Sequence, residues 1–155
     1  MEATARAAGR TGSEDAMHRY LVIANQTIES PLLLEAIEQR KAQGPSDFHL
    51  LVPENHLQGS TWEEGHARAD AKRRLAEGIA YFADHRIPMT GEVDTTPVDG
   101  VGNILLREGH DAFDEIIIST LPVTLSRWLK LDAPSRIQRL TKVPVTHVAA
   151  SMAEP

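Results

Sequence analysis

The chain has 155 residues, a length typical of one domain with a sizeable hydrophobic core. Its formal net charge is −6 and its basic residues are spread along the sequence, which argues against a nucleic-acid partner. It has no cysteine, so disulfides and thiolate chemistry are excluded. No apolar stretch approaches the roughly 18 residues needed to cross a bilayer, and we expect a cytoplasmic protein without a membrane partner.

The beginning of the chain predicts a disordered N-terminal tail over residues 1–18. This segment mixes basic and acidic residues with Ala, Gly, Thr and Ser, so it lacks the apolar centre of a signal peptide. Residues 19–150 are expected to form the single folded domain.

The next segments alternate between apolar runs and helical patterns. Residues 20–24 form a short apolar run, which predicts a buried strand. Ser30 and Pro31 then supply an N-cap and a first-turn proline for a helix that ends near Gly44. A second apolar run over residues 48–52 predicts the second strand.

A long helix and a weaker strand are predicted next. Ser60 and Glu63 form a capping-box pair, and apolar residues follow at spacings of three and four over residues 67–82. The basic run 72–74 lies within this helix and indicates a solvated helix face. The proline and glycine within residues 87–93 favour a strand at the edge of the sheet.

The last part of the chain repeats the alternation. Thr96, followed by proline, predicts the start of another helix, which ends at Gly109. The remaining predicted elements are a buried strand over 114–119, a loop and short helix over 120–129, a helix over 134–142 and an edge strand over 143–148.

The alternation of strands and helices predicts an α/β fold. Five predicted strands interleaved with helices are typical of a parallel sheet covered on both faces, a three-layer α/β/α sandwich. Ligands of such open sheets bind beyond the carboxyl ends of the strands. Here these ends carry Asn25, Val52, Ser119 and Thr120.

Over residues 19–149 the pattern resembles the universal stress protein family, whose Rossmann-like sheet has the strand order 3-2-1-4-5. ATP-binding members carry Gly-x2-Gly-x9-Gly-Ser/Thr after the fourth strand, often with a Leu-Ser-Arg triplet inside it. Residues 125–127 match that triplet. The resemblance implies a Rossmann-like five-stranded sheet and a nucleotide-binding origin.

The resemblance also implies a set of nucleotide-binding positions. Asn25 stands where the family has an aspartate that contacts the adenosine part of ATP. Val52 matches a valine near the end of the second strand. The candidate cofactor-binding residues are Asn25, Val52, Ser119, Thr120, Ser126 and Arg127.

The phosphate-binding glycines of the family are missing. All ten glycines lie at or before Gly109. Glycines let backbone N–H groups approach phosphate oxygens, and Pro122 removes one N–H group from the loop. Asp132 would repel a triphosphate, although it would favour the next helix as its N-cap. We expect no tightly bound cofactor, and ATP or another adenine nucleotide only at micromolar or weaker affinity.

Catalytic and metal sites are not expected. The hydroxyls of Ser119 and Thr120 lack the Gly-x-Ser-x-Gly elbow that would expose a nucleophile. Among the seven histidines, His56 and His66 lie near Glu54 and other carboxylates, but no His-x3-His spacing occurs.

The leading hypothesis is a non-enzymatic stress or regulatory protein with a degenerate cleft for a nucleotide or small molecule. The resemblance implies a homodimer that pairs through Val143–Val148. One alternative is a nucleotide hydrolase or transferase that holds phosphate through Arg127, Thr120 and Thr124.

A further alternative is an interaction module. Its cleft would be filled by its own side chains, with Leu121 and Trp128 as candidates.

Overall fold

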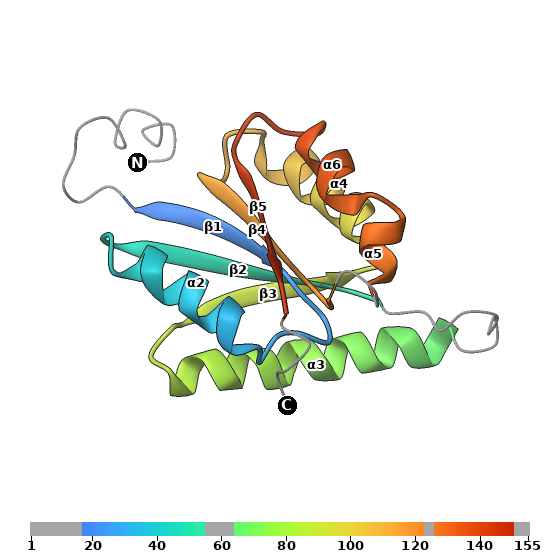
Figure 1. Cartoon of the computed structure of the whole chain (residues 1–155), viewed down its shortest axis with the longest axis horizontal. Coiled ribbons are helices and arrows are strands. Elements are labelled where there is room, and N and C mark those ends of the chain that lie inside the picture. Colours follow the sequence, from blue (N-terminus) through green and yellow to red (C-terminus); the bar gives the residue numbers. More distant parts are fainter. Residues whose placement is uncertain (1–16, 55–63, 123–125, 151–155) are drawn as a thin grey trace.

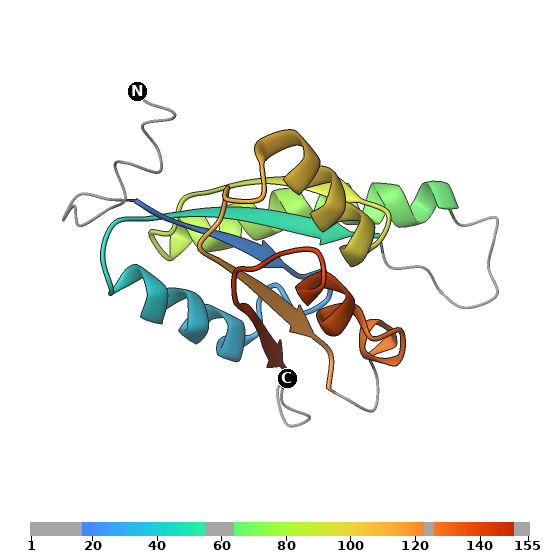
Figure 2. The same cartoon turned by 90° about the horizontal axis from the view of Figure 1, so that it is seen from above.

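A computed structural model describes residues 17–54, 64–122 and 126–150 (Figure 1). One sheet holds the five strands described, in the order β3-β2-β1-β4-β5, and all of its pairings are parallel. Figure 2 shows the strands running in one direction. The strands are β1 (His18–Ile23), β2 (Ser46–Pro53), β3 (Met89–Asp94), β4 (Glu115–Thr120) and β5 (Val145–Ala149).

Helices cover both faces of the sheet, which confirms the predicted three-layer architecture. α2 and α3 lie on one face, and α4, α5 and α6 lie on the other (Figure 1). In the part of the chain that the structure describes, no helix is long and apolar enough to cross a membrane. The helices are α2 (Pro31–Lys41), α3 (Glu64–Asp84), α4 (Pro97–Glu108), α5 (Arg127–Lys130) and α6 (Ala133–Gln138).

The central strand β1 is buried on both faces. Val22 belongs to the core cluster beneath α2 and α3, whereas Leu21 and Ile23 belong to the cluster beneath α4 and α6. Successive side chains of a strand point to opposite faces, so a strand covered on both sides needs a continuous apolar run. This requirement explains the apolar run that predicted β1.

Side-chain caps begin two of the helices, as the sequence predicts. Ser30 Oγ accepts a hydrogen bond from the backbone N of Leu32 at 3.3 Å, at the start of α2. Thr96 Oγ1 accepts one from the backbone N of Asp99 at 3.0 Å, at the start of α4. Both helices also carry the predicted proline in their first turn.

The two edge strands are β3 and β5, as predicted. The structure gives the glycine in β3 a second role. A Cβ atom at Gly91 would lie 2.5 Å from Leu75 Cδ1 and 2.7 Å from the carbonyl oxygen of Leu50. Gly91 therefore lets α3 pack close to this edge of the sheet.

The structure corrects two predicted boundaries. β1 begins at His18, within the segment predicted as a tail. α6 ends at Gln138, four residues before the predicted end at residue 142. The side chain of Gln138 donates hydrogen bonds to the carbonyl oxygens of Thr141 and Val143, and it accepts one from Val145 N. These bonds fold the chain into a turn that leads directly to β5.

The expected side-chain cap at Asp132 is wrong. Asp132 has a left-handed backbone conformation with φ of 59°, and its side chain makes no capping hydrogen bond. Its carboxylate instead lies 3.7 Å from the guanidinium of Arg139. The predicted capping box of Ser60 and Glu63 lies outside the residues described.

Candidate functional site

The carboxyl ends of β1, β2 and β4 meet at the centre of the sheet, because β1 pairs with both of the others. This arrangement brings together Asn25, Val52, Ser119 and Thr120, as the sequence predicts for a cleft. Their exposed fractions are 3%, 0%, 1% and 1%, respectively. The four residues are therefore buried at the edge of the sheet where its strands have their carboxyl ends.

Asn25 joins the ends of β1 and β2 and keeps an unused acceptor. Its Nδ2 donates a hydrogen bond to the carbonyl oxygen of Pro53 at 2.6 Å. Its Oδ1 is buried and has no hydrogen-bond partner among the residues described. A buried acceptor without a partner costs free energy, and this atom exposes less than 1 Å² of surface to water or to a ligand. An ionised aspartate could not make the bond to Pro53, because it has no donor.

Val52 lies in β2 on the face that α3 covers. It belongs to the same core cluster as Ala24 and Ala71 and has no exposed surface. Its side chain therefore contributes to packing within the protein.

The hydroxyl of Ser119 is used within the protein. Ser119 Oγ and Thr27 Oγ1 lie 2.6 Å apart, and both residues are buried. This hydrogen bond ties the loop between β1 and α2 to the end of β4. The loop is thereby fixed over the carboxyl ends of the central strands.

Thr120 and His147 form a hydroxyl–imidazole pair between β4 and β5. Thr120 Oγ1 donates to the carbonyl oxygen of Leu121 at 2.9 Å and lies 2.8 Å from His147 Nε2. When the hydroxyl proton points to Leu121, the tautomer of His147 that carries the proton on Nε2 donates to Thr120; when it points to His147, Nε2 accepts. Partial burial of the ring lowers the pKa of His147. A reactive nucleophile would need a freer hydroxyl, because a general base must be able to take its proton.

Ser126 serves as the N-cap of α5. Its Oγ accepts a hydrogen bond from the backbone N of Leu129 at 3.2 Å. Trp128 is half-buried and packs against the core cluster beneath α4 and α6. The side chain of Arg127, and all of Thr124, lie outside the part that the structure describes.

Glu54, at the end of β2, is paired with an arginine. Its carboxylate accepts a hydrogen bond from Arg68 Nε at 2.6 Å, and its side chain is only 4% exposed. Over residues 17–54, 64–122 and 126–150, no three His, Asp or Glu side chains come together as a possible metal site. His56, in the best metal cluster suggested by the sequence, falls outside these ranges.

A pocket of about 250 Å³ opens between the β1–α2 loop and α3. Gly78 allows the loop to lie this close, because a Cβ atom there would be 3.0 Å from Ile28 Cγ2. We call this space the α3 pocket. Its lining residues are Asn25, Gln26, Ile28, Glu29, Arg74, Glu77 and Gly78.

The polar side chains around the α3 pocket have few internal partners. The side chains of Gln26, Glu29, Arg74 and Glu77 make no hydrogen bond or ion pair with any other residue that the structure describes, and all but that of Arg74 belong to exposed residues. Burial and then the charge of Glu29 raise the pKa of the nearby Tyr81. The pocket is therefore polar, with two carboxylates and one guanidinium on its wall.

Sequence reasoning missed Arg74, because it treated the whole basic run as a solvated helix face. Arg73 fits that description, since it is exposed and pairs with Asp70 at 3.0 Å. Arg74 is half-buried and lines the α3 pocket. The available signal was its position four residues before Gly78, on the same side of the helix.

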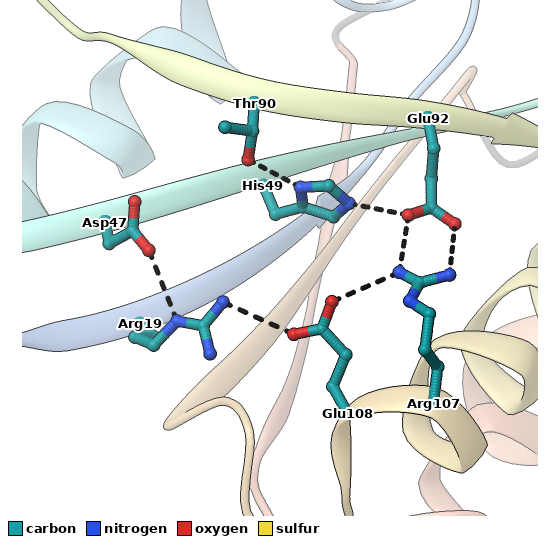
Figure 3. Close-up of polar contacts among 7 residues, drawn as sticks. All are labelled: Arg19, Asp47, His49, Thr90, Glu92, Arg107 and Glu108. Atoms are coloured by element: carbon teal, nitrogen blue, oxygen red, sulfur yellow. Dashed lines mark hydrogen bonds and ion pairs between the residues drawn. The ribbon is translucent and has the colours of Figure 1, made fainter. Parts of the chain in front are cut away.

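A second polar cluster lies on the other face of the sheet, beside α4 (Figure 3). We call it the Glu92 network. Arg107 donates two hydrogen bonds to the carboxylate of Glu92, at 3.3 and 2.7 Å. His49 Nε2 lies 2.9 Å from the same carboxylate. The network consists of Arg19, Asp47, His49, Thr90, Glu92, Arg107 and Glu108.

Every member of the Glu92 network has a partner. Arg19 bonds Asp47 at 3.2 Å and lies 3.7 Å from Glu108, which also accepts from Arg107. Burial alone would raise the pKa of Glu92, but hydrogen bonds from Arg107 and His49 outweigh it and hold this pKa below its usual range. The network is internally satisfied, which indicates a structural role.

The comparisons with known proteins bear on the fold. No protein-family model matches the chain, and no curated protein matches it. A solved universal stress protein from Archaeoglobus fulgidus matches with 12% identity over 84% of this chain and 93% of that chain, at a TM-score of 0.58. The universal stress protein from the same organism in complex with dAMP matches with 13% identity over 86% and 98%, at a TM-score of 0.52. The chain therefore has the fold of the universal stress proteins, as its sequence predicts.

Proposed function

We propose that the chain is a non-enzymatic, homodimeric regulatory protein of the stress-protein type that binds an adenine nucleotide at micromolar or weaker affinity. The nucleotide occupies the carboxyl end of the sheet, beyond β1, β2 and β4. The observation that carries the proposal is that these three strand ends meet around Asn25, in a sheet with the strand order of the universal stress proteins.

The ligand class is supported by the fold and by position. One solved structure of the same fold contains dAMP. In open α/β sheets the ligand lies beyond the carboxyl ends of the strands, which is where Asn25 stands. We expect weak affinity because the loop that would bind the phosphates offers few backbone N–H donors. No glycine follows Gly109, and Pro122 lacks an N–H group.

A non-enzymatic role is supported by the hydroxyls at the site. Ser119 is bonded to Thr27, and Thr120 donates to a backbone carbonyl. Both residues are also buried, each with an exposed fraction of 1%, so neither is placed to attack a phosphate or an acyl group. Regulation through nucleotide occupancy requires binding alone.

The dimer is proposed to form through β5. This strand lies at the edge of the sheet, so one side of its backbone is open to pairing with a second copy. The absence of cysteine suits the reducing cytoplasm, where we place the protein. Native mass spectrometry is expected to give twice the mass of the chain, and a monomer at micromolar concentration would contradict the dimer.

The binding proposal is tested by calorimetric titration with adenosine, AMP and Mg-ATP. We expect all three to bind weakly and within about tenfold of one another, because the phosphates find few donors. Asn25→Leu is expected to weaken all three equally. Gln39→Leu, an exposed substitution on α2, is the matched control. Sub-micromolar Mg-ATP binding would contradict the proposal, and so would nucleotide binding that survives Asn25→Leu unchanged.

A further inference from the structure

The backbone groups of β5 divide into two sets, one on each side of the strand. On the inner side, Ala150 N donates a hydrogen bond to Thr120 O at 2.9 Å. Backbone groups of a strand alternate between its two sides, so the even-numbered residues bond β4. The N–H and C=O groups of Val145, His147 and Ala149 therefore face outward, at the open edge of the sheet (Figure 1).

The side chain of Gln138 covers part of this edge. Its Oε1 accepts a hydrogen bond from Val145 N at 3.1 Å, and its Nε2 donates one to Val143 O at 2.9 Å. The outward N–H and C=O groups of His147 and Ala149 have no hydrogen-bond partner among the residues described. Such an open row on an edge strand is a template for pairing with another chain.

The bonds of Gln138 restrict how a second copy can pair. A copy that extends the sheet across a two-fold axis runs antiparallel to β5, and opposite outward residues exchange both of their hydrogen bonds. With the axis at residue 145, 146 or 147, Val145 N would have to bond the partner, but Gln138 already holds it. An axis at Ala149 leaves only one exchanging pair within the strand.

An axis at Val148 has neither disadvantage. His147 then exchanges two hydrogen bonds with the partner's Ala149, and Ala149 does the same with the partner's His147. Val145 N stays bonded to Gln138. Val148 faces the partner's Val148, and because Val148 packs against the core cluster beneath α2 and α3, the two valines extend an apolar surface.

We propose that Gln138 sets the register of the homodimer, so that a second copy of the chain pairs through residues 147–149 with the two-fold axis at Val148. The inference rests on the proposed dimer and names its contact residues. Gln138 acts as a positioning residue, because it closes the amino-terminal part of the edge to strand addition.

Single cysteines can locate the axis, because the chain has none of its own. Thr146→Cys, His147→Cys and Val148→Cys are oxidised mildly, and the crosslinked dimer is followed on non-reducing gels. A disulfide needs Cα atoms within about 7 Å. In the proposed register the two copies of residue 148 lie about 4.5 Å apart, those of residue 147 about 8 Å and those of residue 146 about 14 Å.

We expect Val148→Cys to crosslink at least about tenfold faster than the other two variants. Urea unfolding of each variant checks that its fold is kept. Faster crosslinking of His147→Cys or Thr146→Cys, or equal rates for all three, would overturn the register.

A second substitution tests the role of Gln138. Gln138→Leu frees Val145 N, so crosslinking of His147→Cys should rise about fivefold relative to that of Val148→Cys. Gln39→Leu, the same change at an exposed position of α2, is the matched control. A ratio that Gln138→Leu leaves unchanged would overturn the role of Gln138.

Amide exchange of the unmodified chain decides the point if Gln138→Leu does not fold. Val145 N–H should exchange slowly in the dilute monomer and in the dimer, because Gln138 holds it in both. The N–H groups of His147 and Ala149 should become slow only in the dimer. Fast exchange of Val145 N–H in the dilute monomer would overturn the proposal.

The outcomes separate this inference from the proposed function. A chain that is monomeric by native mass spectrometry refutes both the dimer and its register. A dimer in which Val148→Cys is not the fastest to crosslink refutes the register alone.

Discussion

The Glu92 network and the α3 pocket lie on opposite faces of the sheet, and both are rich in charged side chains. In the network, Glu92 is held by Arg107 and His49, and every other member is paired. In the pocket, Glu29, Arg74 and Glu77 pair with nothing among the residues described. Polar composition therefore does not distinguish the two regions. The number of internal partners does.

The difference follows from where the residues stand. The network draws on neighbouring strands, where cross-strand side chains lie close enough to pair directly. His49 in β2, for example, reaches Thr90 and Glu92 in β3. The pocket draws on a loop and on one face of a helix, and the space between these elements stays open. Water or a ligand must then satisfy the pocket residues.

The largest expected effect is a difference in the free energy of unfolding between two variants, each of which removes one carboxylate from one region. Glu92→Leu leaves Arg107 and His49 without their acceptor and should lower the free energy of unfolding by about 1–2 kcal/mol, after allowance for solvent screening at the half-exposed Arg107. Glu77→Leu should change it by about 0.5 kcal/mol or less. Urea unfolding with equal m-values measures both. Similar losses in the two variants would remove the distinction between the regions.

Double-mutant cycles measure the coupling energy between two charged side chains in each region. The cycle of Glu92→Gln with Arg107→Gln is expected to give a coupling energy of about 0.5–1 kcal/mol. The matched cycle of Glu77→Gln with Arg74→Gln should give a coupling near zero, because these side chains form no hydrogen bond or ion pair with each other. A clear coupling in the second cycle would mean that the pocket charges pair in solution.

The pH dependence of stability should follow the Glu92 network. Because the folded-state pKa of Glu92 lies below the ordinary 4.5, its contribution is fully present above that value and is lost as the pH falls through the lowered pKa. The stability difference between the unmodified chain and Glu92→Gln should therefore shrink between neutral pH and about pH 3. Chemical unfolding at several pH values measures this. A difference that stays constant into acid would contradict the network's hydrogen bonds.

The smallest expected effect concerns His147, whose Nε2 is bonded to Thr120. Its folded-state pKa lies below the ordinary 6.5, so the unfolded chain binds the proton first as the pH falls. Stability should fall below about pH 6.5 by less than about 1 kcal/mol, because the ring is partly exposed to solvent. His147→Gln should remove this fall, and the exposed His110→Gln should not. Identical pH profiles for both variants would argue against a lowered pKa at His147.

The fold could be predicted because its strands are apolar runs of the right length. The run containing Leu21 to Ile23 is fully buried, as a central parallel strand requires. The caps at Ser30 and Thr96 marked two helix starts correctly. The end of α6 was missed, because the bonds made by the side chain of Gln138 depend on a turn that sequence periodicity does not show.

The candidate site was less predictable. The rule that ligands bind beyond the carboxyl ends of the strands correctly placed Asn25 and Ser119 together. The sequence did not show that the hydroxyl of Ser119 is hydrogen-bonded to Thr27. Strand alternation from Leu50 places Val52 on the same face, beneath α3, so its burial could have been anticipated. Its spacing of four residues from Gly78 placed Arg74 on the same side of the helix, but the burial of that side depends on how α3 meets the β1–α2 loop, which the sequence does not show.

The pairing of β1 with β4 has a consequence for synthesis on the ribosome. The backbone N of Arg19, in β1, donates to the carboxylate of Asp114, just before β4, across a sequence separation of 95 residues. At about 5–20 residues per second, roughly 5–20 s pass between the emergence of the two strands. During that interval one side of an apolar central strand has no neighbour, a state prone to aggregation. We therefore expect newly made chains to be most prone to aggregation before β4 has been synthesised.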